Sequence, residues 1–117
     1  MAAEKQVGMH PITALLFSWA TDLVREWGDD TIHFSTKEVP EYHYSVFVFW
    51  CSGEVAYEYT VWWWDTTYLL EAGEVRDLER MSKGNVLSGL ERFFTRKREH
   101  WQSKADMARA HRERYWL

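Results

Sequence analysis

The stretch that most constrains the fold is residues 41–64, EYHYSVFVFWCSGEVAYEYTVWWW. Two runs rich in Val, Tyr, Phe and Trp lie on either side of Ser52-Gly53, and such residues favour a pleated, half-buried sheet surface. A two-residue connection that contains Gly is typical of a tight β-hairpin turn. The sequence therefore predicts one long hairpin in which Trp50 lies opposite Val55.

This register sorts the hairpin residues into two sets, because side chains alternate between the two faces of a strand. One set carries no charge, and we expect it to face the core. The other set is mixed, and we expect its aromatic residues either to be covered by a second helical layer or to dock a partner. The uncharged set is Tyr42, Tyr44, Val46, Val48, Trp50, Val55, Tyr57, Tyr59, Val61 and Trp63, and the aromatic members of the mixed set are Phe47, Phe49, Trp62 and Trp64.

An amphipathic helix is predicted before the hairpin. Pro11 suits the first turn of a helix, Gly28 suits the position just past its end, and apolar residues recur between them at helical spacing. Residues 31–36 then alternate as a short strand, with Ile32 and Phe34 toward the core. The predicted order is α-β-β-β, a three-stranded antiparallel meander packed on the N-terminal helix.

The pattern after the hairpin predicts a short helix, an interruption at Lys83-Gly84 and then, with Asn85 as N-cap, a last long helix that runs toward Tyr115. The apolar stripe of this helix weakens along its length. We therefore expect a single domain, residues 1–117, in which residues 95–117 form a projecting helical tail. The predicted fold class is α+β, ordered α-β-β-β-α(-α) and ending in a long basic C-terminal helix.

Cysteine content and hydropathy indicate the compartment. Cys51 is the only cysteine, so the chain can form no internal disulfide, which suits a reducing environment. The first residues, MAAEKQVGMHP, lack the basic start and apolar run of a secretory signal. No apolar stretch approaches the length of a membrane span. We expect a small cytoplasmic protein that does not enter a membrane.

The net charge of −4 is unevenly distributed along the chain. Residues 1–83 contain 14 acidic and 6 basic residues, a net charge of −8. Residues 84–117 contain 4 acidic and 8 basic residues, a net charge of +4. Such asymmetry often marks a segment with its own partner, although a basic end can also pack against its own acidic body.

The last predicted helix contains a row of basic residues at steps of four, which places them on one face of the helix. Like charges in such a row destabilise a helix unless an anion lies against them, and phosphate groups would serve. The alternatives are a solvated face that is partly balanced by Glu99 and Glu113, or a face that is turned toward acidic protein. The row consists of Arg92, Arg96, His100 and Lys104.

The chain shows no pattern typical of catalysis or metal binding. Its five histidines are scattered, and no Cys/His cluster has the spacing of a structural zinc site, so we expect neither a metal nor a cofactor. Glycine-rich phosphate loops, G-x-S-x-G and H-E-x-x-H are absent. Cys51 has no histidine close enough along its strand to act as a base. We therefore expect that the protein is not an enzyme.

The element order α-β-β-β followed by a helix is similar to that of the double-stranded-RNA-binding domain. The basic loop motifs of that family are absent here, so the resemblance implies the order of the elements and not RNA binding. In size, acidity and lack of motifs the chain also resembles small phage-encoded inhibitor proteins such as anti-CRISPRs. That resemblance implies a viral protein that works by binding.

The first hypothesis is a small non-enzymatic binding protein that docks a larger protein or nucleoprotein and acts by occlusion or bridging, with a homodimer as a variant. The alternative hypothesis is a nucleic-acid-binding protein that uses the basic face of its last helix. Aromatic residues beside charge are the types most enriched at binding hot spots. The partner-binding candidates are Phe47, Phe49, Trp62, Trp64, Tyr115 and Trp116, and the nucleic-acid-binding candidates are Arg92, Arg96, Lys97, His100 and Lys104.

Overall fold

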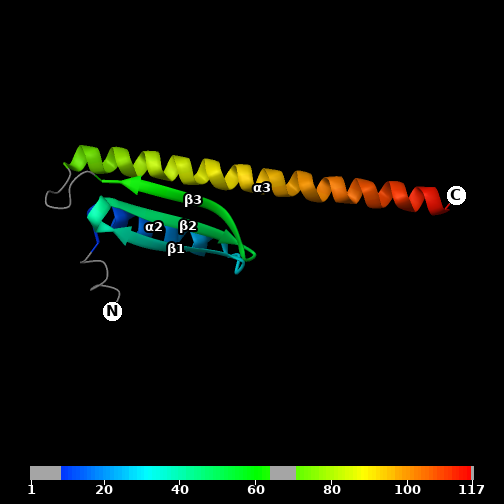
Figure 1. The fold of residues 1–117 in the computed structure, drawn as a ribbon, viewed down its shortest axis with the longest axis horizontal. Helices are drawn as coiled ribbons and strands as arrows, with labels where there is room; N and C mark the ends of the chain where they lie inside the picture. Colours follow the sequence, from blue (N-terminus) through cyan, green and yellow to red (C-terminus); the bar gives the residue numbers. More distant parts are fainter. Residues whose placement is uncertain (1–8, 64–70, 117) are drawn as a thin grey trace.

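The computed structural model describes residues 9–63 and 71–116, with side chains up to residue 113. The three strands form one antiparallel sheet in the order β1-β2-β3 (Figure 1). This confirms the predicted α+β class with a three-stranded meander packed on an N-terminal helix. The elements are α2 (Pro11–Trp27), β1 (Ile32–Val39), the 3-10 turn η1 (Pro40–Tyr42), β2 (Tyr44–Cys51), β3 (Glu54–Trp62) and α3 (Ala72–Trp116).

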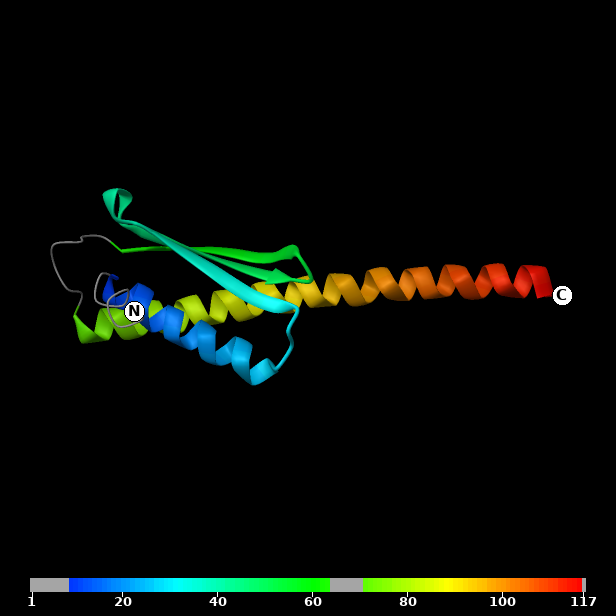
Figure 2. The same cartoon turned by 90° about the horizontal axis from the view of Figure 1, so that it is seen from below.

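The molecule has two layers. Figure 2 shows α2 and α3 on the same side of the sheet, where α3 packs against β3 and α2 packs against α3 and β1. The core lies between the layers, and none of the helices in the described ranges lies on the opposite face of the sheet. The largest contributors to the core are Ile12, Leu16, Phe47, Phe49, Val61, Trp63, Val86, Leu90 and Phe93.

Helix α2 begins and ends at the predicted signals. Pro11 occupies the first turn, and the His10 side chain caps the helix by accepting a 3.2 Å hydrogen bond from the backbone N–H of Ile12. At the other end Gly28 adopts the left-handed conformation (φ +63°), and its N–H donates to the carbonyl of Arg25. These two caps satisfy backbone groups that the helix itself leaves unpaired.

The hairpin turns at Ser52-Gly53, as predicted, and both residues have positive φ, as a two-residue type I′ turn requires. The pair Trp50–Val55 next to the turn also has the predicted register. The register then shifts by one residue, so that Phe49 lies opposite Tyr57. The predicted register continues with Val48 opposite Tyr57 and is wrong by one position from here on, because Val48 lies opposite Glu58.

The shift leaves Ala56 as an extra residue, a β-bulge, and it reverses the predicted faces of β2. One extra residue changes the phase of alternation, so residues before and after it on β3 face opposite sides. Phe47 and Phe49, at 2% and 1% exposure, face the helices, as does Ser45. The prediction that the uncharged set forms the inner face was therefore wrong for Tyr44, Val46, Val48, Trp50 and Val55, and also for Tyr42, which lies in η1 and is exposed. Val61 and Trp63 are buried, and Tyr57 and Tyr59 pack against the core.

Helix α3 is one continuous helix, so the interruption predicted at Lys83-Gly84 and the N-cap predicted at Asn85 were wrong. An interior glycine costs a helix about 1 kcal/mol relative to alanine, and this cost is small beside the packing of α3 on the sheet. On the two sides of the glycine, Val86 is buried in the core and the Ser82 hydroxyl lies 2.9 Å from the Tyr59 hydroxyl.

A second glycine of α3 has the opposite surroundings. Gly89 is buried where α3 crosses β3, and a Cβ atom at this position would overlap the ring of Tyr57. Gly84 is exposed, and a Cβ atom there would meet nothing within 4 Å. The aromatic ring of Tyr57 therefore lies directly against the helix backbone, which only glycine allows.

These two glycines give a matched pair of substitutions in one helix. Gly84→Ala should raise the free energy of unfolding by about 0.5–1 kcal/mol, because alanine loses less backbone entropy in a helix. Gly89→Ala should lower it by about 1–3 kcal/mol, because the added methyl group overpacks the contact with Tyr57. Urea denaturation of both variants checks the prediction, and a change of the same sign in both would contradict it.

Candidate binding surfaces

Metal and membrane sites are not found in the part of the chain that the structure describes. Within residues 9–63 and 71–116, no group of three or more His, Cys, Asp or Glu side chains could hold a metal ion. Within the same ranges, no helix combines the length and the apolar character needed to cross a membrane. The remaining candidates are surfaces.

The first candidate is the sheet face that the helices leave uncovered, called here the open sheet face. Its central strand, β2, presents only apolar or aromatic side chains, all half-buried. Beside them on β3 lie Trp62, which is 55% exposed, and Val55, which is 45% exposed. The row on β2 consists of Tyr44, Val46, Val48 and Trp50.

An aromatic pair lies at each end of this row. Tyr44 contacts Trp62 across the β2–β3 pairing, with ring centroids 4.6 Å apart. Trp50 stacks parallel to His33 of β1, with centroids 6.0 Å apart. Between the two pairs, Glu58 lies opposite Val48 and is exposed. The face is thus an apolar strip with polar groups along its edge strands, which is the usual composition of a protein–protein interface.

The structure separates the predicted partner-binding residues. Trp62 lies on the open sheet face and is exposed. Phe47 and Phe49 belong to the core. A helical layer covers them, which is the first of the two alternatives expected from the sequence, and they are not available to a partner in the folded protein. Trp64 lies outside the described residues, and the side chains of Tyr115 and Trp116, at the end of α3, do so as well.

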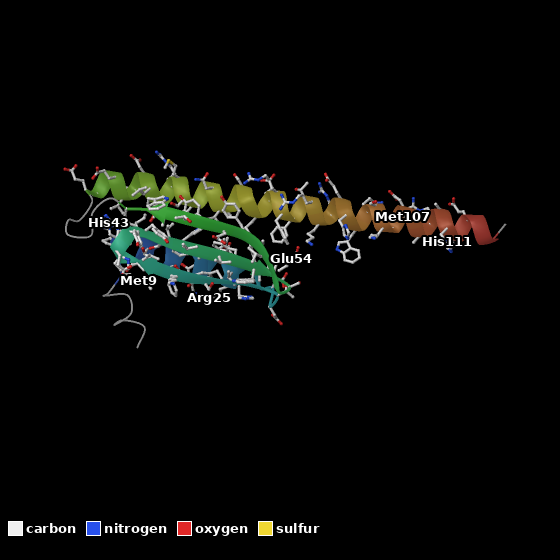
Figure 3. All side chains as sticks on the ribbon, in the orientation of Figure 1. Met9, Arg25, His43, Glu54, Met107 and His111 are labelled. Atoms are coloured by element: carbon white, nitrogen blue, oxygen red, sulfur yellow. The ribbon has the colours of Figure 1, made fainter. Side chains whose placement is uncertain are left out.

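The second candidate is the part of α3 beyond the sheet, residues 98–116, called here the helix extension (Figure 1). All its side chains from residue 98 to residue 113 are exposed, and it gives the molecule its length of 72 Å against widths of 27 and 25 Å. Just before the extension begins, an ion pair between α3 and the sheet joins Lys97 Nζ to Glu54 Oε2, at 2.8 Å. Figure 3 shows Glu54 at the end of the hairpin, whereas Met107 lies well beyond it.

The face of α3 that packs on the sheet continues along the helix extension. Its residues recur at steps of three and four, through Leu90, Phe93 and Lys97, and the same steps lead on to Trp101, Lys104 and Ala108. We call these last three residues the continuation face. Trp101 is 67% exposed, whereas Phe93, which lies at the same phase of the helix nearer the sheet, is buried. The acidic residues of the extension, Glu99, Asp106 and Glu113, recur every seven residues on the opposite side.

The nucleic-acid-binding candidates also divide. Arg92, Arg96, His100 and Lys104 are exposed on α3, and a surface hollow beside Arg92 and Arg96 is lined by Glu91 and Thr95 as well. Lys97 is not part of this row, because it binds Glu54 and its ammonium group lies 5.4 Å from the centre of the Phe93 ring.

A buried polar cluster joins the start of α2 to the sheet. The Ser45 hydroxyl lies 2.6 Å from the Thr13 hydroxyl and accepts a 3.2 Å hydrogen bond from Trp63 Nε1. The ring of His10 stacks on the ring of Trp63 with centroids 4.4 Å apart. The backbone N–H of His10 donates a hydrogen bond to the carboxylate of Glu38. Sequence reasoning missed this cluster, because its members lie on four separate segments and no local spacing connects them.

Comparison with protein-family models, with curated proteins and with solved structures finds no match for this chain. The function must therefore be argued from the two surfaces.

The buried cluster generates a pH prediction. Burial lowers the pKa of His10 below its ordinary value of 6.5, more than the nearby Glu38 carboxylate raises it. As the pH falls below about 6.5, the unfolded chain takes up this proton before the folded protein does, so the free energy of unfolding should decrease. His10→Asn keeps an N-cap side chain but cannot titrate in this range. Urea denaturation between pH 8 and pH 5.5 should show a smaller loss for the variant, and equal losses would contradict the prediction.

Proposed function

We propose that the protein is a small non-enzymatic binding protein that docks a larger protein or nucleoprotein through its open sheet face. The observation that carries this proposal is the apolar row of β2 on the face opposite the two described helices, α2 and α3. Antiparallel sheets with one solvated face usually alternate apolar inward and polar outward residues. On β2 the outward residues are apolar or aromatic instead, and burying them against a partner gains about 25 cal/mol per Å².

The chemistry of the face indicates how a partner would be recognised. Trp50, Trp62 and Tyr44 are of the residue types that dominate binding energy when water is excluded from them. Lys37 of β1 and Glu58 of β3 stand at the rim, where opposite charges on the partner fix orientation and favour association. A partner covered in this way would lose access to its own surface, so the protein would act by occlusion, as an inhibitor of the phage-encoded kind does.

A substitution at Trp62 tests the proposed surface. Trp62→Ala should weaken partner binding by about 30-fold, the factor that corresponds to a hot spot of about 2 kcal/mol. Because the side chain is half exposed, the variant should fold normally, which circular dichroism can check. The control is Met81→Ala, a similarly exposed apolar residue (61%) on α3, the layer that covers the other face of the sheet.

The experiment first captures partners with the tagged full chain. Surface plasmon resonance then measures the affinity of each captured partner for the wild-type, Trp62→Ala and Met81→Ala proteins. A partner bound equally well by the Trp62→Ala protein, or bound poorly by the Met81→Ala protein, would show that the open sheet face is not the docking surface.

The alternative, nucleic-acid binding, is supported by the exposure of Arg92, Arg96, His100 and Lys104 on one row of α3. It predicts binding of a 20-base-pair DNA or RNA duplex with an affinity that falls steeply with salt. The double variant Arg92→Glu with Arg96→Glu should abolish that binding. Fluorescence anisotropy distinguishes the proposals, because salt-sensitive duplex binding that disappears in this variant and persists in the Trp62→Ala protein would favour the alternative.

A further inference from the structure

We propose that two copies of this chain pair in antiparallel orientation through their helix extensions, so that the end of each α3 helix reaches the body of the other copy. This pairing goes beyond the docking of a partner on the open sheet face, because it uses a different surface. Two observations carry it: the continuation face and the distribution of charge between the two ends of the extension.

The continuation face is the surface that a second helix would cover. Leu90 and Phe93, at the same phase of α3 nearer the sheet, are buried by the body, but Trp101 has no such cover. Lys104 and Ala108 follow Trp101 on this face, with Ala105 beside them. The two alanines allow a neighbouring helix to approach closely, and the long stem of Lys104 can lie along that helix with its ammonium group in water. An exposed tryptophan followed by small residues fits helix packing better than it fits a solvated surface.

Five carboxylates lie at the base of the helix extension, where two of them pair with Arg25 and Lys97 and the other three leave the base net acidic. Trp27, at the end of α2, contacts Phe94 with ring centroids 6.3 Å apart, and Glu54 pairs with Lys97, so both the α2 end and the hairpin end lie at this base. The turn after α2 and the last turns of α2 add exposed carboxylates. The acidic rim defined in this way consists of Asp22, Glu26, Asp29, Asp30 and Glu54.

The far end of the helix extension is basic. Arg109, which also pairs with Asp106 at 3.5 Å, and Arg112 are exposed there, and we call them the basic tip. The extension of residues 98–116 is about 28 Å long at 1.5 Å per residue, and the Debye length at physiological salt is about 8 Å. The basic tip and the acidic rim of one molecule are therefore too far apart to interact with each other.

Antiparallel pairing brings these opposite charges together twice. With the two extensions side by side and reversed, each basic tip lies at the acidic rim of the other copy. Parallel pairing would instead place tip against tip and rim against rim, which is electrostatically unfavourable. The antiparallel pair is also closed by a two-fold axis, so it ends at two copies and does not grow into a filament.

The first test is the mass of the full chain by sedimentation equilibrium. The wild-type protein should sediment as a dimer of 14.1 kDa chains, and the dissociation constant should rise when salt is raised from about 50 to about 500 mM. Trp101→Ala should raise the dissociation constant at least tenfold, whereas the control Met81→Ala should leave it unchanged. A monomer at 100 μM, or a dimer indifferent to Trp101→Ala, would overturn the proposal.

A charge-reversal pair tests the orientation. One variant carries Arg109→Glu and Arg112→Glu, which makes the tip acidic, and the other carries Asp22→Lys, Glu26→Lys and Asp30→Lys, which leaves two carboxylates against three lysines and makes the rim basic. Each variant alone should be monomeric, because its tip repels the rim of an identical copy. A 1:1 mixture should form a heterodimer, because both tip-to-rim contacts are then attractive.

Failure of the mixture to dimerise, with both variants folded by circular dichroism, would exclude antiparallel pairing. A wild-type monomer that binds a 20-base-pair duplex through the extension would show instead that nucleic acid is the occupant of the continuation face. Neither result bears on the open sheet face, which the Trp62→Ala protein tests separately.

Discussion

The register shift between β2 and β3 is the constraint on which the rest of the structure depends. With Ala56 as an extra residue, Phe49 and Tyr57 both turn toward the helices, and the Tyr57 ring then lies against the backbone of α3 at Gly89. The contact sets how closely α3 approaches the sheet, and α3 and α2 together cover this face. The outward row of β2 is uncovered for the same reason, since the bulge moves Phe47 inward and Val48 outward.

Much of this architecture could be read from the sequence where a local signal exists. Pro11 and Gly28 mark the ends of α2, and Ser52-Gly53 marks the hairpin turn. The bulge at Ala56 has no such signal, because an uncharged face could be drawn for the hairpin without it. Gly84 gave a false signal, since a helix interior accepts a glycine when packing on both sides outweighs its entropic cost.

The same limits explain the outcome for the binding residues. Trp62 was placed on the outer face correctly, because its place on β3 does not depend on how β2 is aligned, whereas Phe47 and Phe49 were placed on the face opposite the core and in fact belong to the core. The aromatic row of β2 was taken for core, and only the paired strands reveal it as surface. His10, Thr13 and Ser45 share a cluster that tertiary contacts alone create.

The unbroken course of α3 has a consequence for folding. Starting a helix in water is costly, whereas lengthening an existing one is nearly neutral for each added residue. The turns of α3 that are held by Ser82, Val86 and Leu90 therefore act as a template on which the helix extension is wound. The helical state of the extension therefore depends on the packing of those turns against the sheet. Loosening the core would unwind a segment that touches none of it.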